Sequence, residues 1–204
     1  MSMLGVFTVG AWVVPGITPF EAARDLWILF ALYWLVSALK RKKTKQRESI
    51  GQRLGYILPI VGVFYVLYNR RIDVDWLATY FVPNTLAMQW AGVAVMALGL
   101  GFACWARVHL GTNWSGVVTL KEGHELIRTG PYRNIRHPIY TGILMGFLGY
   151  AIVGGQVRGL IAMAAVWLSF FIKARREEQF LEQEFGPKFE EHTRHTGMFL
   201  PKFS

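Results

Sequence analysis

The sequence contains one cysteine, Cys104, among its 204 residues. A single cysteine excludes an internal disulfide and any zinc cluster built from cysteine ligands, and its place in an apolar run is typical of a small core or lipid-facing residue. Histidine spacings of metal sites, such as HExxH, are also missing, so no metal ion is expected. The sequence has no Walker or dinucleotide-binding glycine motif and no serine in a GxSxG setting, which excludes those types of site.

Acidic residues are few: 13 Asp and Glu stand against 22 Lys and Arg, which gives a formal net charge of +9. Such a balance indicates a negatively charged partner, either nucleic acid or anionic lipid. Because 53% of the residues are hydrophobic and apolar runs recur along the chain, we expect membrane lipids and no nucleic acid. No basic stretch with a following cleavage site opens the sequence, and its last residues form no prenylation motif, so neither a cleaved signal nor a lipid anchor is expected.

No apolar run is very long, so the hydrophobic residues must be divided among several spans. We therefore predict an all-α integral membrane protein with about five transmembrane helices. The second, fourth and fifth runs are shorter than the ~17–25 residues that usually span a bilayer, and whether they cross fully stays open. Pro59 should kink the second helix. A capping-box spacing at Thr18-Pro19-Phe20-Glu21 predicts the first helix start, whereas residues 1–17 have no clear period. The expected spans are residues 18–39, 54–68, 86–108, 138–153 and 157–172.

The basic residues predict the orientation of these spans. With five crossings, eighteen Lys and Arg fall on one side, in a basic loop over residues 40–53, in residues 107–137 and from residue 173 onward. Four fall on the other side. Cytoplasmic loops carry the excess of basic residues, so the C-terminus should be cytoplasmic and the N-terminus outside.

Residues 124–142, HELIRTGPYRNIRHPIYTG, lie between two apolar runs and concentrate basic side chains. Proline suits the first position of a helix, so Pro138 should open the fourth helix with His137 as its cap. The N–H groups and dipole of that helix start favour an anion. We divide the single structural domain into N-terminal helices (residues 1–110) and a C-terminal half (residues 111–204) that carries the candidate site, with this loop, a helical hairpin and an amphipathic tail.

Two charged clusters, in residues 121–140 and 173–178, should face the same compartment and indicate a site for a small charged ligand. Taken alone, the first is also typical of lipid-headgroup binding, and Glu177-Glu178 is also typical of a solvated helix face. The GxxxG step from Gly142 to Gly146 predicts close helix packing, which would allow the fifth helix to bring the glutamates near His137.

Two segments carry a resemblance. GHELIRTGPYRNIRHPIYTG resembles the RHPxYxG region of the isoprenylcysteine carboxyl methyltransferases and their bacterial and archaeal relatives. REEQFLEQEFGPKFEEHTRHTGMFLP resembles that family's EE-x5-FG-x2-Y…P ending, with Phe189 at the usual tyrosine position. The two motifs cover about the last 80 residues and also fit a wider group that includes phospholipid methyltransferases.

The resemblance implies S-adenosylmethionine as methyl donor, S-adenosylhomocysteine as product and a cytosolic cofactor pocket built by the C-terminal half. At the expected acceptor-steering arginine the chain has Lys173, which lacks the planar two-point grip on a carboxylate. The resemblance places cofactor contacts at His124, Glu125, Leu126, Ile127, Tyr132, His137, Pro138, Ile139, Tyr140 and Glu177. Catalytic or acceptor-side roles fall to Lys173, Arg175, Arg176 and Glu178.

The expected function is methyl transfer to a lipophilic acceptor from the bilayer, a lipid or lipid-modified molecule with a carboxylate. A carboxylate is ionised at neutral pH and needs no general base. One alternative is a phospholipid N-methyltransferase, in which His137 or Glu178 would act as base. Further alternatives are a membrane reductase with a nicotinamide cofactor and a non-catalytic lipid- or heme-handling protein.

Overall fold

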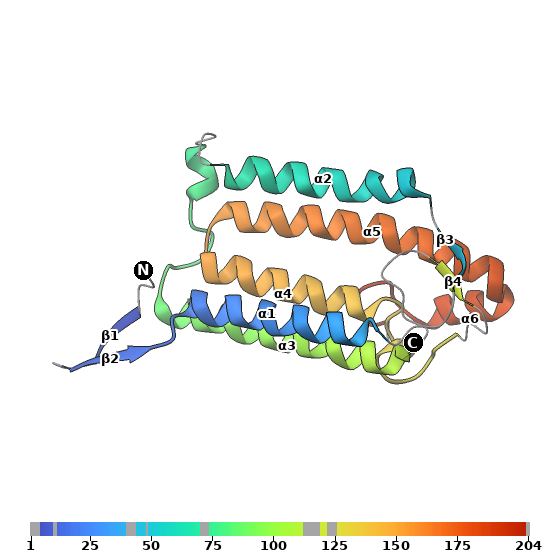
Figure 1. Ribbon diagram of the computed structural model, residues 1–204, viewed down its shortest axis with the longest axis horizontal. Coiled ribbons are helices and arrows are strands. Elements are labelled where there is room, and N and C mark those ends of the chain that lie inside the picture. The colour runs from blue at the N-terminus through green and yellow to red at the C-terminus, as the bar shows by residue number, and fades with distance from the viewer. Residues whose placement is uncertain are drawn as a thin grey trace.

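The computed structural model describes residues 5–9, 12–39, 44–47, 49–69, 74–111, 119–121 and 126–202. Helices dominate it, and five long ones lie side by side with their axes along one direction (Figure 1). Helix α5 packs between α2 and α4, α4 packs on α3, and α3 also contacts α1. The helices are α1 Pro19–Ser37, α2 Ile50–Tyr68, α3 Leu86–Leu110, α4 Pro138–Gly154, α5 Val157–Phe185 and α6 Pro187–His195.

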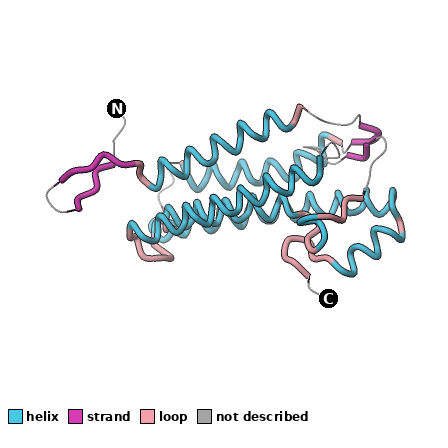
Figure 2. The backbone as a smooth tube through the Cα atoms, turned by 90° about the horizontal axis from the view of Figure 1, so that it is seen from below, coloured by secondary structure: helices cyan, strands magenta, loops and turns pink. Residues whose placement is uncertain are grey.

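Short antiparallel strand pairs accompany the helices. Strands β1 Gly5–Val9 and β2 Trp12–Gly16 form a hairpin, and β3 Thr44–Arg47 pairs with β4 Thr119–Lys121. Figure 2 shows the hairpin projecting from one end of the bundle, with α6 and the loop after it at the other end. Single 3-10 turns occur at η1 Asp75–Ala78 and η3 Gly130–Arg133. The all-α prediction is confirmed for the bundle, and the strand pairs were not foreseen.

The protein is an integral membrane protein. Within the described residues, three helices are long and apolar enough to cross a bilayer: Ile50–Leu67, Leu86–Leu110 and Val157–Phe185. Helix α4 is apolar but has only 17 residues, and α1 carries Glu21, Arg24 and Asp25 in its first two turns. All five predicted helices are therefore present, while the number of full crossings stays a prediction.

Two helices extend beyond the apolar runs that predicted them. Helix α2 begins at Ile50 because Ser49 and Gln52 form a capping box that starts it within the predicted basic loop, and it continues through Pro59. Helix α5 does not end at residue 172 but runs to Phe185, since the charged residues there are good helix formers. It stops at Gly186, whose φ of +49° places it in the left-handed region. The predicted capping box of Thr18 and Glu21 is confirmed.

Glycines bring α3 and α4 into backbone contact. A Cβ on Gly142 would lie 2.5 Å from the carbonyl oxygen of Gly99, and a Cβ on Gly149 would lie 2.5 Å from that of Gly92. The predicted close packing is therefore confirmed, with α3 as the partner of this face. This backbone contact fixes the position of α4 against α3, and the first residue of α4 follows directly after His137.

Candidate functional site

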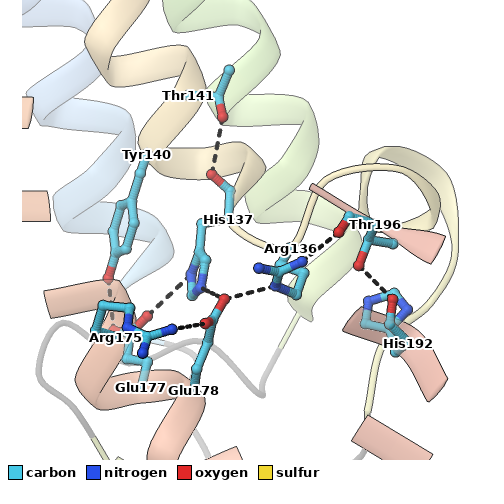
Figure 3. Close-up of polar contacts among 9 residues, drawn as sticks. All are labelled: Arg136, His137, Tyr140, Thr141, Arg175, Glu177, Glu178, His192 and Thr196. Atoms are coloured by element: carbon cyan, nitrogen blue, oxygen red, sulfur yellow. Dashed lines mark hydrogen bonds and ion pairs between the residues drawn. The ribbon is translucent and has the colours of Figure 1, made fainter. Parts of the chain in front are cut away.

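The site lies where the start of α4 meets the charged end of α5 (Figure 3). Pro138 is the first residue of α4 and His137 is its N-cap, as predicted. The His137 side chain makes no capping bond, and its imidazole instead reaches the carboxylates of α5. The residue is 7% exposed, so polar partners must replace the water that its ring gives up.

His137 contacts two consecutive glutamates. Its Nε2 lies 3.2 Å from Oε1 of Glu178, and its Nδ1 lies 3.5 Å from Oε2 of Glu177. Burial alone would lower the pKa of His137, but the hydrogen bonds and charges of the two carboxylates outweigh it and raise the pKa above its ordinary value. The arrangement therefore favours an imidazolium that donates from both nitrogens.

Different donors contact the two carboxylates. Arg136 Nε lies 2.7 Å from Oε1 of Glu178, and Arg175 Nη1 lies 3.8 Å from its Oε2. The hydroxyl of Tyr140 donates to Oε1 of Glu177 over 2.6 Å. The Glu178 side chain is 10% exposed and that of Glu177 is 22% exposed. Glu177 is thus the more accessible carboxylate, while cations engage both oxygens of Glu178.

Aromatic rings surround the imidazole. The Tyr140 ring is nearly parallel to that of His137, with centroids 5.4 Å apart, and stacks on Phe170 of α5 at 4.6 Å. The ammonium of Lys173 lies 5.3 Å from the centroid of the Tyr140 ring, a cation–π distance. Phe199 contributes a further ring edge, 6.2 Å from His137 by centroid. Rings and one cation thus border the polar cluster.

The two candidate arginines of α5, Arg175 and Arg176, point in different directions. Arg175 is 63% exposed beside Glu178. Arg176 turns to α2, where it donates to the carbonyl of Gln52 and lies 5.7 Å from the ring centroid of Tyr56. The structure therefore brings Glu178 to His137 and Lys173 to Tyr140, whereas Arg176 links α5 to α2.

Several candidate cofactor residues pack into the bundle. Tyr132 and Ile139 form a buried cluster with Ala106, and Ile127 packs against it. Burial is also the main cause that raises the pKa of Tyr132. Pro138 is fully buried, and Leu126 is half-buried. His124 and Glu125 lie outside the described residues. The structure therefore places these side chains in the packed core next to His137, and their role as cofactor contacts stays a prediction.

Residues 87–188 match the phospholipid methyltransferase family. The chain belongs to this family. The matched range contains His137, Tyr140, Glu177 and Glu178. The predicted class, a membrane methyltransferase, is confirmed at the level of the family.

Individual relatives agree with this placement. The "Cobalt-zinc-cadmium resistance protein CzcN" of Cupriavidus metallidurans is 30% identical over 68% of this chain and 67% of its own length. The protein-S-isoprenylcysteine O-methyltransferase of Dictyostelium discoideum is 25% identical over 62% of this chain and 55% of its own. A probable enzyme of that name from Oryza sativa subsp. japonica is 30% identical over 56% and 61%. The predicted isoprenylcysteine methyltransferase resemblance is thereby confirmed, although the match covers little more than half of these two methyltransferases.

A solved structure shares the fold. It is the eukaryotic intramembrane Ras methyltransferase ICMT, which superposes with a TM-score of 0.60 over 90% of this chain and 66% of its own, at 20% identity. At that identity the likeness shows the fold of this phospholipid methyltransferase family member and does not transfer residue roles.

Three residues at the site, Arg136, Phe170 and Phe199, were not predicted from the sequence to lie beside His137 and the glutamates. Arg136 was only one of the basic side chains of residues 124–142, and Phe170 has the pattern of any apolar residue in the predicted fifth span. Phe199 lies 62 positions after His137 in the sequence, and the sequence near it has no pattern that predicts this contact. Among the residues that the structure describes, no group of three or more His, Cys, Asp or Glu side chains is arranged so that it could hold a metal ion.

Histidines near the site differ in charge. Burial, together with the guanidinium groups of Arg128 and Arg136, lowers the pKa of His192 on α6 to about 4. His192 is thus neutral at pH 7, whereas the glutamates favour protonation of His137. The charge that a ligand meets at this end of α4 therefore depends on His137, Arg136 and the glutamates.

Proposed function

We propose that this chain transfers the methyl group of S-adenosylmethionine to a carboxylate on a lipid or lipid-modified acceptor. The observation that carries the proposal is the buried His137–Glu177–Glu178 cluster at the charged end of the α4–α5 hairpin. The family supplies the reaction class, and relatives named protein-S-isoprenylcysteine O-methyltransferase support a carboxyl acceptor.

The residues fit the proposed cofactor chemically. S-adenosylmethionine carries an ammonium, ribose hydroxyls, a carboxylate and a sulfonium. The carboxylate of Glu177, partly exposed and already an acceptor for Tyr140, suits the ammonium or a ribose hydroxyl. The N–H groups of Ile139 and Tyr140, in the first turn of α4 after Pro138, suit the cofactor's carboxylate. When bound, the cofactor supplies an electrophilic methyl group, and the protein's part is to orient the two reactants and exclude water.

The geometry favours a carboxylate over an amine acceptor. An amine must lose a proton, and the two side chains suited to take it are both engaged. His137 lies between two carboxylates that favour its protonated form, and Glu178 is paired with Arg136 and Arg175. A carboxylate needs no base, and Lys173 beside Tyr140 offers it a cation. We therefore assign Lys173 and Arg175 to the acceptor side.

Purified protein in lipid nanodiscs tests the function. We expect calorimetry to detect binding of S-adenosylhomocysteine, and methyl-labelled S-adenosylmethionine to pass label to a lipid that mass spectrometry identifies as a base-labile methyl ester. Lys173→Arg should retain or raise this activity because it restores a bidentate donor. Label in an alkali-stable N-methyl lipid would instead establish the amine acceptor. Binding of a nicotinamide cofactor alone would indicate a reductase, and binding of neither cofactor would contradict the proposal.

We also propose that the site and α6 face the cytoplasm, because eighteen of 22 basic residues lie on that side of the predicted topology. In a Cys104→Ala background, Lys202→Cys should resist impermeant thiol reagents in intact cells, whereas Asp75→Cys should react. Both positions are exposed, so burial does not explain a difference. Both should react after the membrane is permeabilised, and the reverse pattern in intact cells would refute this orientation.

A further inference from the structure

The segment after α6, residues 196–202, lies along the start of α4; we call it the strap. The backbone N–H of Arg136 donates to the carbonyl of Gly197 over 2.8 Å, and that of His137 donates to the carbonyl of Met198 over 3.0 Å. Gly197 donates in return to Asn134 over 3.1 Å. The strap therefore pairs with the main chain of the residues that carry the site's imidazole and guanidinium.

Side chains on α4 and in the loop before it also hold the strap. The hydroxyl of Thr141 donates to the carbonyl of Phe199 over 2.7 Å and also lies 3.2 Å from the carbonyl of His137, within its own helix start. The guanidinium of Arg136, which also binds Glu178, donates to the carbonyl of Thr196. Figure 3 shows Arg136 between Glu178 on one side and Thr196 on the other. One side chain thus joins the strap to the carboxylate cluster.

The strap also places an aromatic ring against the site. The ring of Phe199 meets those of His137 and Tyr140 at 60° and 63°, with centroid distances of 6.2 and 6.4 Å. Edge-to-face contacts at these distances are favourable and directional. Both His137, the N-cap of α4, and Tyr140, on α4, contact the carboxylate of Glu177. A ring that touches both restricts how either can turn away from that carboxylate.

We propose that the strap, through Phe199, is a positioning element of the methyltransferase site: it holds His137 and Tyr140 in the orientation that presents Glu177 to the cofactor. The inference rests on the proposed function. The strap lies beyond residues 87–188, the range that matches the family, and the ending motif that extends over it assigns none of its residues a role. Phe199 acts through the two residues that it contacts and is not itself a reacting group.

Two substitutions test the strap by independent routes. Phe199→Leu removes the ring and keeps an apolar side chain. Thr141→Val removes, at nearly constant volume, the hydroxyl bond to the strap together with the longer contact to the His137 carbonyl. Each should weaken S-adenosylhomocysteine binding about 5- to 10-fold, measured by calorimetry per folded molecule. The double variant should lose less than the product of the two factors, because both changes release the same segment. Phe199→Tyr retains the ring and should bind like the parent.

Matched controls separate positioning from general damage. Phe20→Leu changes a phenylalanine that is 49% exposed on α1, and Thr193→Val removes a hydroxyl bond internal to α6; both should bind like the parent. Amide hydrogen exchange at Arg136 and His137 should accelerate in Phe199→Leu and Thr141→Val only. If the parent binds the cofactor and these two variants bind it equally well, the strap proposal is refuted and the proposed function stands. If the parent itself does not bind S-adenosylhomocysteine, the proposed function and the strap proposal both fail.

Discussion

His137→Ala is expected to weaken S-adenosylhomocysteine binding by about 10- to 150-fold, the effect of losing one hydrogen bond to a charged group. The imidazole contacts both Glu177 and Glu178 from a buried position, so its removal leaves two neighbouring carboxylates with fewer donors. The same loss should lower the apparent melting temperature by roughly 3–12 °C, given 2–4 °C per kcal/mol for a chain of this size. Calorimetry and thermal unfolding in the same detergent measure the two effects.

The pH dependence identifies the imidazolium as the cause. The two carboxylates raise the folded-state pKa of His137 above its ordinary value of 6.5. A raised folded pKa contributes stability that is fully present below about pH 6.5 and is lost as pH rises through the folded value. The parent should therefore lose more stability than His137→Ala between pH 6 and pH 9. The matched control is His195→Ala, at an exposed position on α6, and it should follow the parent. Parallel curves for all three proteins would show that folding does not raise the pKa of His137.

Local signals in the sequence predicted much of this fold. Apolar runs placed all five long helices, because a span must be hydrophobic over most of its length. Proline and capping residues predicted two starts, at Pro19 and Pro138, because they act within one turn. The meeting of His137 with the glutamates also agrees with the sequence-based hypothesis, since the short turn between α4 and α5 leaves the polar ends of this helical hairpin side by side.

What the sequence did not predict depends on contacts between distant segments. Helix α5 continues to Phe185, beyond the end of its apolar run. The predicted end was too early because it was taken from hydropathy, whereas the charged residues that follow have high helix propensity. The sequence did not tell which helix packs on the Gly142 face of α4. A small-residue pattern indicates that another helix packs closely there, but it does not indicate which one. The strap contacts join residues about 60 positions apart, and neither segment has a periodicity that indicates the other.

In the candidate site, too, some features could be predicted from the sequence and others could not. Motif residues at the start of α4 and in α5 meet in space, and their bonds follow from charge. Yet the motif does not tell which of its members point inward: Pro138 and Ile139 pack in the core, although they are adjacent to His137. Helical geometry sends consecutive side chains to different faces, so a continuous motif in sequence cannot be a continuous wall of one pocket. Their assignment as cofactor contacts stays a prediction.

Gly142→Ala is expected to destabilise the bundle although it adds a single methyl group. The new Cβ would lie 2.5 Å from the carbonyl oxygen of Gly99, 2.6 Å from the backbone nitrogen of Ala103 and 2.8 Å from its Cβ. Two of these atoms belong to the backbone of α3, so no side-chain rotation relieves the clash and the helices must separate. Overpacking of this kind costs about 1–3 kcal/mol. Thermal unfolding should show an apparent melting temperature roughly 2–12 °C lower.

The same variant should also weaken cofactor binding, because Gly142 lies little more than one helical turn after His137 on α4. Displacement of α4 from α3 moves His137 and Tyr140 relative to the glutamates of α5, and misplacement by about 1 Å can cost on the order of 100-fold in a catalytic site. Gly101→Ala is the matched control: it lies on α3 with no atom within 4 Å of the added Cβ, so it should keep the parent's affinity and stability. A Gly142→Ala protein that equals this control in both measurements would show that the α3–α4 contact yields without moving the site.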